Sequence, residues 1–306
     1  MKHIYIIGNG FDIFTGLKTS YSDFRKWLER HYVFVYENMT SAYEMSGEWW
    51  HDFENQLGNL DVRKYVQKYT PPEKSIAEIL EEIEKQREFE NKYNLPPSMI
   101  PETPCAERLR GLLDVLQYCF EQWVDYSQRR ITVPNYINIE KNDSYFINFN
   151  YTDVLECIYK IPEERVLHIH GRASKHEHLI FGHGKRLNAD VILSHDEQET
   201  CEELNRYNKN PYEYIYKHND LPEKLKDVEY VHVYGFSISQ VDENYLDWIE
   251  MKTPRNSQWE FSWYSDEDRN RIDRFIRNHY RLENRVKMIR LEDIKIKERF
   301  DGELVI

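Results

Sequence analysis

MKHIYIIGNGFDIFTGL, residues 1–17, is the stretch that decides the fold of this 306-residue chain. Its apolar run at residues 4–7 is too short for a helix and ends at a glycine, which is typical of a strand buried on both faces of a parallel sheet. Gly8 and Gly10 let the backbone turn sharply after this strand and leave N–H groups open to a phosphate. We therefore predict a nucleotide-binding turn here, and a tight turn without a ligand is the alternative.

Short apolar runs return in the second half of the chain, with helical patterns between them. Strands are predicted at residues 144–149, 166–169, 179–181, 228–234, 259–264 and 286–288. Helices are predicted at residues 154–159, 197–218 with a break at Pro211, 242–249 and 266–280. Alternating strands and helices are typical of an α/β fold, so we expect a doubly wound parallel, Rossmann-like sheet.

A long helical stretch separates the first predicted strand from the others. Apolar residues repeat at helical spacing around residues 49–57 and again around residues 76–83. A stretch of about a hundred residues is too long for a simple crossover between two strands. We expect residues 1–32 and 140–306 to form a nucleotide-binding core and residues 33–139 to form a helical insertion or cap.

The composition is that of a soluble globular protein, with 40% hydrophobic and 31% charged residues. The mean hydropathy of −0.80 and the lack of a long apolar run exclude a transmembrane helix. No signal peptide is visible and the four cysteines form no CxxC pair, so we expect a cytoplasmic protein with reduced thiols and no membrane partner. The net charge of −13 argues against nucleic acid as a partner.

Small or polar residues follow four of the predicted strands at the point where each strand ends. These segments are residues 8–12, 150–153, 170–171 and 235–237. The carboxyl ends of parallel strands open onto one crevice, which is where ligands bind in open α/β sheets. The four segments are therefore predicted to form one site.

The same segments resemble the motifs of the sirtuin and SIR2-like NAD-binding domains. Residues 8–12 (GNGFD), followed by Gly16, resemble the glycine signature that opens these domains. Residues 149–151 (FNY) resemble the asparagine motif that holds the nicotinamide ribose, and residues 169–171 (IHG) resemble the segment with the catalytic histidine. Residues 235–237 (GFS) resemble the Gly-x-Ser loop that contacts phosphate and ribose.

A narrower resemblance runs from residue 6 to about residue 249. The segments IIGNGFD (residues 6–12), INFNYTDVLE (147–156), HIHG (168–171) and VYGFS (233–237) together resemble the AbiH family of bacteriophage abortive-infection proteins. The resemblance implies a bacterial antiphage effector with a SIR2-related, Rossmann-like core. A phage-derived trigger is then an expected partner, and homo-oligomerisation is left open.

The SIR2-like resemblance implies hydrolysis of NAD+ to nicotinamide and ADP-ribose, with NAD as a substrate and no further cofactor or metal. His170 is the candidate general base, because an unperturbed histidine pKa lies near neutrality. Asn150 is the candidate residue that positions ribose or water, since its amide both donates and accepts hydrogen bonds. The candidate nucleotide-binding residues are Gly8, Asn9, Gly10, Phe11, Asp12, Gly16, Tyr151, Asp153, Gly171, Gly235, Ser237 and Asp242.

Three residues depart from the SIR2-like pattern. Asn9 replaces an alanine, Asp12 replaces a serine, and Thr152 stands where the pattern has an aspartate. An aspartate beside a pyrophosphate would repel it unless the side chain caps the helix or binds a ribose hydroxyl. The zinc cysteines of true sirtuins are missing, which disfavours protein deacylation.

Two other functions fit the sequence. A non-catalytic protein that senses a nucleotide or a phage protein would explain the altered motif. A metal-dependent phosphoesterase or nuclease could draw its ligands from His168, His170, His183 and His195 together with Asp153 or Asp242. Single residues also have structural alternatives: His170 as a core histidine, Asn150 and Asp242 as helix caps, and Ser237 as a turn residue.

Overall fold

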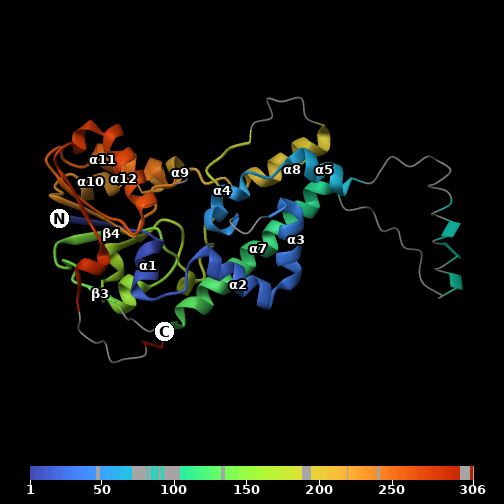
Figure 1. Cartoon of the computed structure of the whole chain (residues 1–306), viewed down its shortest axis with the longest axis horizontal. Helices are drawn as coiled ribbons and strands as arrows, with labels where there is room; N and C mark the ends of the chain where they lie inside the picture. The colour runs from blue at the N-terminus through green and yellow to red at the C-terminus, as the bar shows by residue number, and fades with distance from the viewer. Residues whose placement is uncertain are drawn as a thin grey trace.

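The computed structural model describes residues 1–45, 49–70, 81, 84–85, 87–88, 91–92, 104–131, 135–187, 194–218, 220–239, 242–296 and 304–305. The molecule has an α/β part and an elongated helical part that projects from one side of it (Figure 1). Among the helices of the described ranges, none combines the length and the apolar character needed to cross a lipid bilayer.

The α/β part is built on a parallel sheet of six strands, which confirms the predicted fold class. The strands lie in the order β5-β4-β1-β6-β7-β8, which is 3-2-1-4-5-6 in chain order, the order of a Rossmann fold. Their bounds are β1 (His3–Ile7), β4 (Ser144–Asn148), β5 (Val166–His168), β6 (Tyr230–Tyr234), β7 (Gln258–Ser262) and β8 (Val286–Ile289). Strand β1 is central, so that Ile6 pairs with Ile147 on one side and with Val233 on the other.

The side chains of β1 alternate between two hydrophobic clusters, one on each face of the sheet. Ile4 and Ile6 pack in the cluster that contains residues of α9 (Pro211–Lys217), α10 (Leu221–Leu225), α11 (Glu243–Lys252) and α12 (Asp266–Asn278). Tyr5 and Ile7 pack in the cluster formed with α1 (Asn9–Thr15) and the π-helical turn η2 (Val154–Ile158). Burial on both faces explains why this strand reads as an uninterrupted apolar run.

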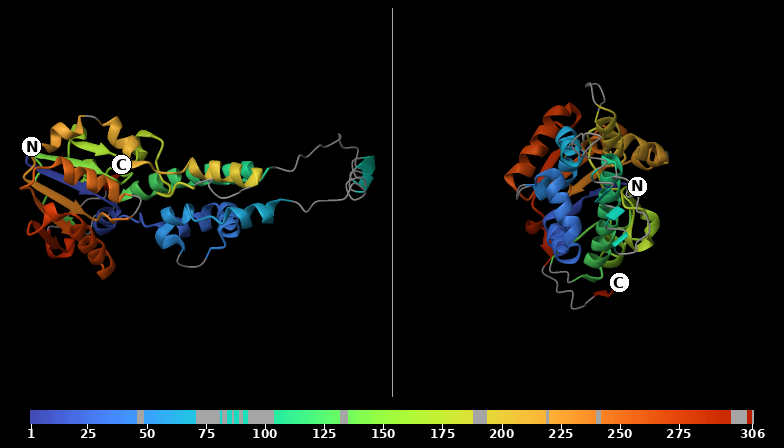
Figure 2. Two further views of the ribbon diagram at one scale, coloured as in Figure 1. Left: turned by 90° about the horizontal axis from the view of Figure 1, so that it is seen from above. Right: turned by 90° about the vertical axis from the view of Figure 1, so that its right-hand side faces the viewer.

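The helical part has its own hydrophobic core. It contains α2 (Tyr21–His31), α3 (Val33–Tyr43), η1 (Trp49–Asp52), α4 (Phe53–Leu57), α5 (Val62–Tyr69), α7 (Cys105–Gln128) and α8 (His195–Asn205). Helices α7 and α8 run side by side along its length (Figure 2). Phe24 of α2 and Leu204 of α8 belong to the same core as residues of α7, although they lie outside residues 33–139.

Several predicted elements differ in the structure. Residues 179–181 form no strand, because the side chains of Leu179 and Phe181 are buried in the helical core and not in the sheet. Two short antiparallel pairs were not predicted, β2 (Arg130–Ile131) with β10 (Leu304–Val305) and β3 (Tyr136–Ile137) with β9 (Lys295–Ile296). Strands of two residues are too short to produce an alternating pattern. Of the helical pattern at residues 76–83, all but residue 81 lie outside the described residues.

Candidate functional site

The glycines after β1 pack directly against the glycine after β6. The Gly8 N–H donates to the Tyr234 carbonyl at 3.0 Å, and the Gly10 N–H donates to the Gly235 carbonyl at 2.7 Å. Gly235 has a φ of +59°, and a Cβ on it would lie 1.9 Å from the backbone nitrogen of Phe11. These glycines are therefore required by backbone packing where the strand order reverses. The Gly10 N–H is not free to bind a phosphate, contrary to the expectation from the sequence.

A large cavity opens at the carboxyl ends of the strands, between the sheet and the helical part. Its volume is ≈ 1390 Å³. Residues at or just after the carboxyl ends of five strands line it, namely Gly8, Asn150, His170, Gly235 and Ser262. The opposite wall comes from the helical part, with residues 49 and 51–56 and the start of α2. The strand ends thus form a floor, and the helices form a wall above it.

His170 and Asp242 face each other in this cavity. Asp242 directly precedes α11, but its side chain makes no capping hydrogen bond. The His170 Nε2 atom lies 3.7 Å from Asp242 Oδ1, and both atoms are buried without a hydrogen-bond partner. Buried polar atoms in proteins are normally paired, so two unpaired polar atoms that line a cavity indicate a place for a ligand or water.

Burial changes the protonation behaviour of this pair. Burial, followed by the positive charge of Lys209, lowers the pKa of His170 well below its ordinary value. Burial raises the pKa of Asp242 to about 6, while the charge of Lys209 acts in the opposite direction. At neutral pH the site therefore contains a neutral imidazole next to a carboxylate.

Asn150, Asp12 and Thr152 form a buried network beside the pair. The Asn150 Nδ2 group donates to Asp12 Oδ1 at 2.7 Å and to the Gly8 carbonyl at 3.1 Å. The Thr152 hydroxyl donates to the other carboxylate oxygen of Asp12. Burial raises the pKa of Asp12 to about 7, although the bonds from Thr152 and Asn150 lower it. Two of the three altered motif residues, Asp12 and Thr152, are thus partners of each other.

The helical part contributes a buried ion pair to the same cavity. Lys209 follows α8 in the chain, and its side chain is only 2% exposed. Its ammonium nitrogen lies 2.6 Å from Glu54 Oε1 on α4. Burial lowers the pKa of Lys209, but the charges of Glu54 and Asp242 more than offset this effect and raise it. Lys209 is therefore charged at neutral pH. Neither residue was predicted, because neither lies in a motif or at a strand end.

A family model described as bacteriophage abortive infection AbiH matches residues 4–263. The chain belongs to the AbiH family. The matched region includes β1, β4, β5, β6 and β7, and so contains the five strand ends named above. No curated protein and no solved structure matches the chain. Membership in this family supports a role in abortive infection.

Ten of the residues predicted for the site line the cavity of this AbiH chain. They are Gly8, Asn9, Gly10, Asp12, Asn150, Tyr151, His170, Gly235, Ser237 and Asp242. The Asn9 side chain donates to the Thr19 carbonyl at 2.7 Å, and the Tyr151 hydroxyl donates to the Ile180 carbonyl at 3.0 Å. Ser237 accepts a hydrogen bond at 2.9 Å from Arg271 of α12, a cavity residue that the sequence analysis missed.

Four predicted residues do not line the cavity, and each has a structural role. Phe11 is fully buried and its ring lies against Tyr159. Gly16 ends α1 with a φ of +117°. Gly171 has a φ of +87°, and a Cβ on it would lie 2.7 Å from the His178 carbonyl oxygen. The Asp153 carboxylate accepts a hydrogen bond from the Arg172 guanidinium.

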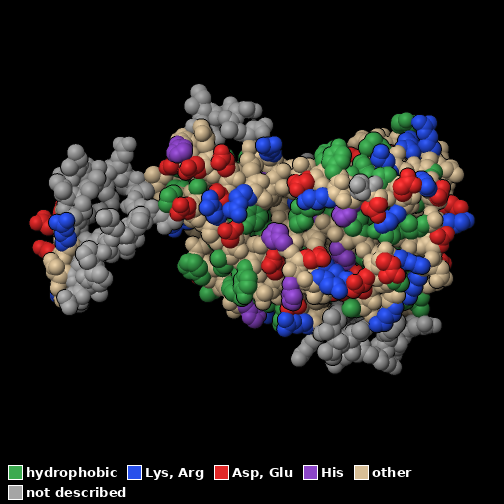
Figure 3. All heavy atoms as spheres, turned by 180° about the vertical axis from the view of Figure 1, so that it is seen from behind, with side chains coloured by type: hydrophobic (Ala, Val, Ile, Leu, Met, Phe, Trp, Pro, Cys, Tyr) green, Lys and Arg blue, Asp and Glu red, His purple; other side chains and the backbone are tan. Residues whose placement is uncertain are grey.

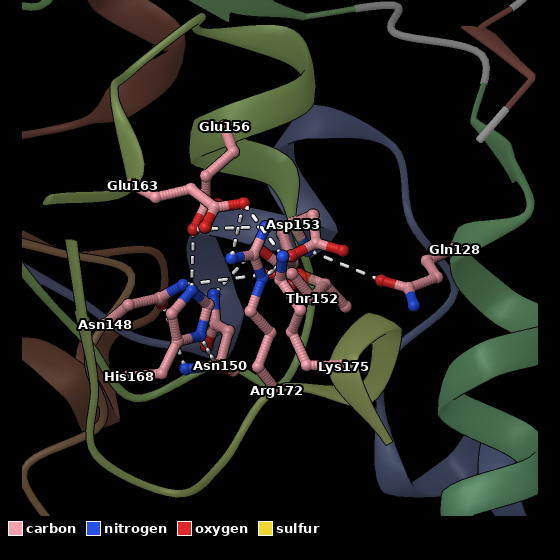
Figure 4. Close-up of polar contacts among 11 residues, drawn as sticks. Gln128, Asn148, Asn150, Thr152, Asp153, Glu156, Glu163, His168, Arg172 and Lys175 are labelled. Atoms are coloured by element: carbon pink, nitrogen blue, oxygen red, sulfur yellow. Dashed lines mark hydrogen bonds and ion pairs between the residues drawn. The ribbon is translucent and has the colours of Figure 1, made fainter. Parts of the chain in front are cut away.

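The acidic residues behind the floor are bound by an arginine (Figure 4). Asp153, Glu156 and His168 lie close enough together to suggest a metal site. The Arg172 guanidinium, however, donates to Asp153 and lies 3.9 Å from Glu156, and His168 Nε2 lies 2.8 Å from Glu156. The Nη1 atom of Arg172 lies 3.1 Å from Glu163 Oε1. These side chains therefore form an ion-pair network in which the arginine supplies the positive charge.

The histidines considered as metal ligands do not converge. His183 is buried with Nε2 3.0 Å from the Leu204 carbonyl oxygen, whereas the His195 side chain is 81% exposed at the start of α8. His168 belongs to the Arg172 network, and His170 faces Asp242. The metal-dependent phosphoesterase or nuclease thus lacks a ligand set made from these four residues.

Charges of both signs are interspersed on one face of this AbiH chain (Figure 3). On the face drawn in Figure 3, the described Lys and Arg side chains alternate with Asp and Glu and form no continuous basic band. A nucleic-acid backbone is bound through such a band. This face therefore gives no support to nucleic-acid binding.

Proposed function

We propose that this AbiH protein is an NAD+ glycohydrolase that acts in abortive infection and releases nicotinamide and ADP-ribose. The observation that carries the proposal is the unpaired, buried couple of His170 Nε2 and Asp242 Oδ1, 3.7 Å apart in the cavity at the switch point of the sheet. Ligands of open α/β sheets bind at such a switch point. The cavity volume of ≈ 1390 Å³ is ample for a dinucleotide.

The chemistry of this bond suits a site with a carboxylate and no strong acid. When the bond between ribose C1′ and the nicotinamide nitrogen breaks, its electron pair passes to the positively charged ring. The ring therefore leaves as a neutral molecule and needs no proton. The ribose becomes oxocarbenium-like, and the Asp242 carboxylate stabilises this developing positive charge in a desolvated site.

His170 and Asn150 act on the attacking water. The oxygen of the water forms the new bond to C1′, and the neutral Nε2 of His170 accepts its proton. Asn150 is fixed through its Nδ2 by Asp12 and Gly8, which leaves its buried Oδ1 without a partner. That oxygen accepts a hydrogen bond from the water or from a ribose hydroxyl.

The test measures nicotinamide release by the purified protein, and cellular NAD after induction. We expect His170→Ala and Asn150→Ala each to lower the rate by about 100-fold or more, the usual contribution of a positioned proton-transfer group. His195→Ala, at an exposed position, is the matched control and should keep full activity. If cellular NAD stays constant on induction of the wild type, or if both site variants remain fully active, the proposal fails.

Calorimetry with NAD and ADP-ribose separates this function from a nucleotide sensor. The glycohydrolase should bind NAD and convert it during the titration. Binding of NAD without any nicotinamide release would instead favour the non-catalytic sensor.

A further inference from the structure

Lys209 carries a positive charge that acts on both members of the His170–Asp242 pair. It reaches the cavity from the helical part, where its backbone N–H donates to the His183 carbonyl at 2.8 Å and its ammonium binds Glu54. Among the described residues, this ammonium donates one hydrogen bond, to Glu54 Oε1, and an ammonium has three N–H donors. A buried cation with unused donors therefore lines the same cavity as an unpaired carboxylate.

We propose that Lys209, held by Glu54, is a positioning residue that keeps His170 a free base and Asp242 a carboxylate. This inference rests on the proposed function, because a free imidazole and an ionised carboxylate are the forms which that reaction needs. It makes the helical part a component of the reaction centre and not merely a cover.

Burial is the larger cause that keeps His170 neutral, and the geometry of the pair shows what the Lys209 charge adds to it. A carboxylate 3.7 Å from an imidazole favours the imidazolium, because the two opposite charges attract. A protonated His170 cannot accept a proton from water. The Lys209 charge repels a proton on His170 and attracts the negative charge of Asp242, so it opposes protonation at both positions.

The other titratable groups around the pair do not replace Lys209. Glu54 is negative and pairs with Lys209 itself. Asp12, in the network beside the pair, is an acid and supplies no positive charge. Four tyrosines have a pKa that is raised by burial, so they stay neutral: Tyr21 of α2, Tyr151 after β4, Tyr214 of α9 and Tyr245 of α11. Arg271 and Arg274 also line the cavity, but Lys209 is the cation whose charge acts on both His170 and Asp242.

The experiment follows the ring of His170 by NMR in the full-length, ligand-free protein labelled on histidine, with the signal assigned by its loss in His170→Gln. In Lys209→Met the His170 pKa should rise by about one unit or more, the size of shift that a nearby charge produces. Lys209→Arg retains the charge and should restore the wild-type titration. Arg110→Met is the matched control, because it removes an ion pair with Glu203 between α7 and α8 outside the cavity, and should leave the titration unchanged.

Loss of Lys209 alone leaves Glu54 as a buried anion, so a double variant guards against misfolding. Lys209→Met with Glu54→Gln removes both charges and should shift the His170 titration in the same direction, because the charge of Lys209, unlike that of Glu54, acts directly on His170. A His170 titration in either variant that matches the wild type would overturn the inference, even with NAD hydrolysis intact. If the His170 pKa rises as expected in these variants but the wild-type protein never hydrolyses NAD, the role of Lys209 is supported and the proposed function is overturned.

Discussion

Asp12 is an ionisable side chain with almost no exposure to solvent, and it joins two strand-end loops. It accepts hydrogen bonds from Asn150 and Thr152, which follow β4, while its own backbone lies in α1 after β1. From the sequence, an aspartate at this position was expected to repel a bound pyrophosphate unless its side chain capped the helix or bound a ribose hydroxyl. The structure shows that its carboxylate instead holds the Asn150 amide in place.

Asp12 should make the stability of the protein depend on pH. Its pKa is raised to about 7 in the folded state and is ordinary in the unfolded chain, so its contribution to stability is fully present below pH 4 and is lost as the pH rises to about 7. The loss amounts to about 4 kcal/mol of unfolding free energy. Urea unfolding of Asp12→Asn should lack this component and so be less pH-dependent than the wild type between about pH 5 and pH 8.

The control for this measurement is Asp227→Asn, at an exposed position away from the cavity, which should keep the pH dependence of the wild type. If Asp12→Asn loses stability with rising pH as steeply as the wild type does, Asp12 is not the group responsible.

At the scale of elements, the central strands β1 and β4 were predictable because they are buried on both faces. The uninterrupted apolar run at residues 4–7 and the largely apolar run at residues 144–149 are typical of such strands, and the strand ends follow from them. The exception is residues 179–181, an apolar run that is buried against helices. Burial makes a run apolar whichever element covers it, so the sequence could not distinguish the two environments.

The contact between the ends of β1 and β6 should be intolerant of any side chain. Gly235→Ala places a Cβ into the backbone of α1 and requires a residue other than glycine at a φ of +59°, so we expect a loss of several kcal/mol, about 3 or more. Gly111→Ala in α7 is the matched control, because a Cβ there meets nothing within 4 Å. It should stabilise the protein by about 0.5–1 kcal/mol.

Thermal unfolding measures both glycine variants. A Gly235→Ala protein with the melting temperature of the wild type would mean that the two strand ends can separate without cost, and would contradict the packing described here.

At the scale of the whole molecule, the site is assembled from two parts that the sequence does not connect. The floor was predictable, because each of its residues directly follows a strand. Glu54 and Lys209 were not, because they are separated by more than a hundred residues in the chain and each lies in an ordinary polar stretch. Their charges meet only after α4 and the end of α8 have packed against the α/β part.

Binding of NAD should stabilise the folded protein as a whole. Since His170→Ala is expected to stop turnover while leaving the floor and the helical wall intact, NAD should persist in the cavity of this variant. At 100 times its dissociation constant, a ligand adds about 2.7 kcal/mol to the unfolding free energy. The melting temperature of His170→Ala should therefore rise with NAD concentration, and an unchanged melting temperature at millimolar NAD would argue against NAD as the ligand.

The floor and the wall of the cavity differ in how freely they can vary over generations. Around Gly8, Gly10 and Gly235 the floor is backbone packed on backbone, so nearly every substitution there breaks the fold before it alters a ligand contact. The wall consists of side chains on helices with a separate hydrophobic core, and apart from Glu54 and Lys209 these can be exchanged one at a time. We therefore expect AbiH sequences to vary little at the floor and more on the helices of the wall, where selection by phages can act.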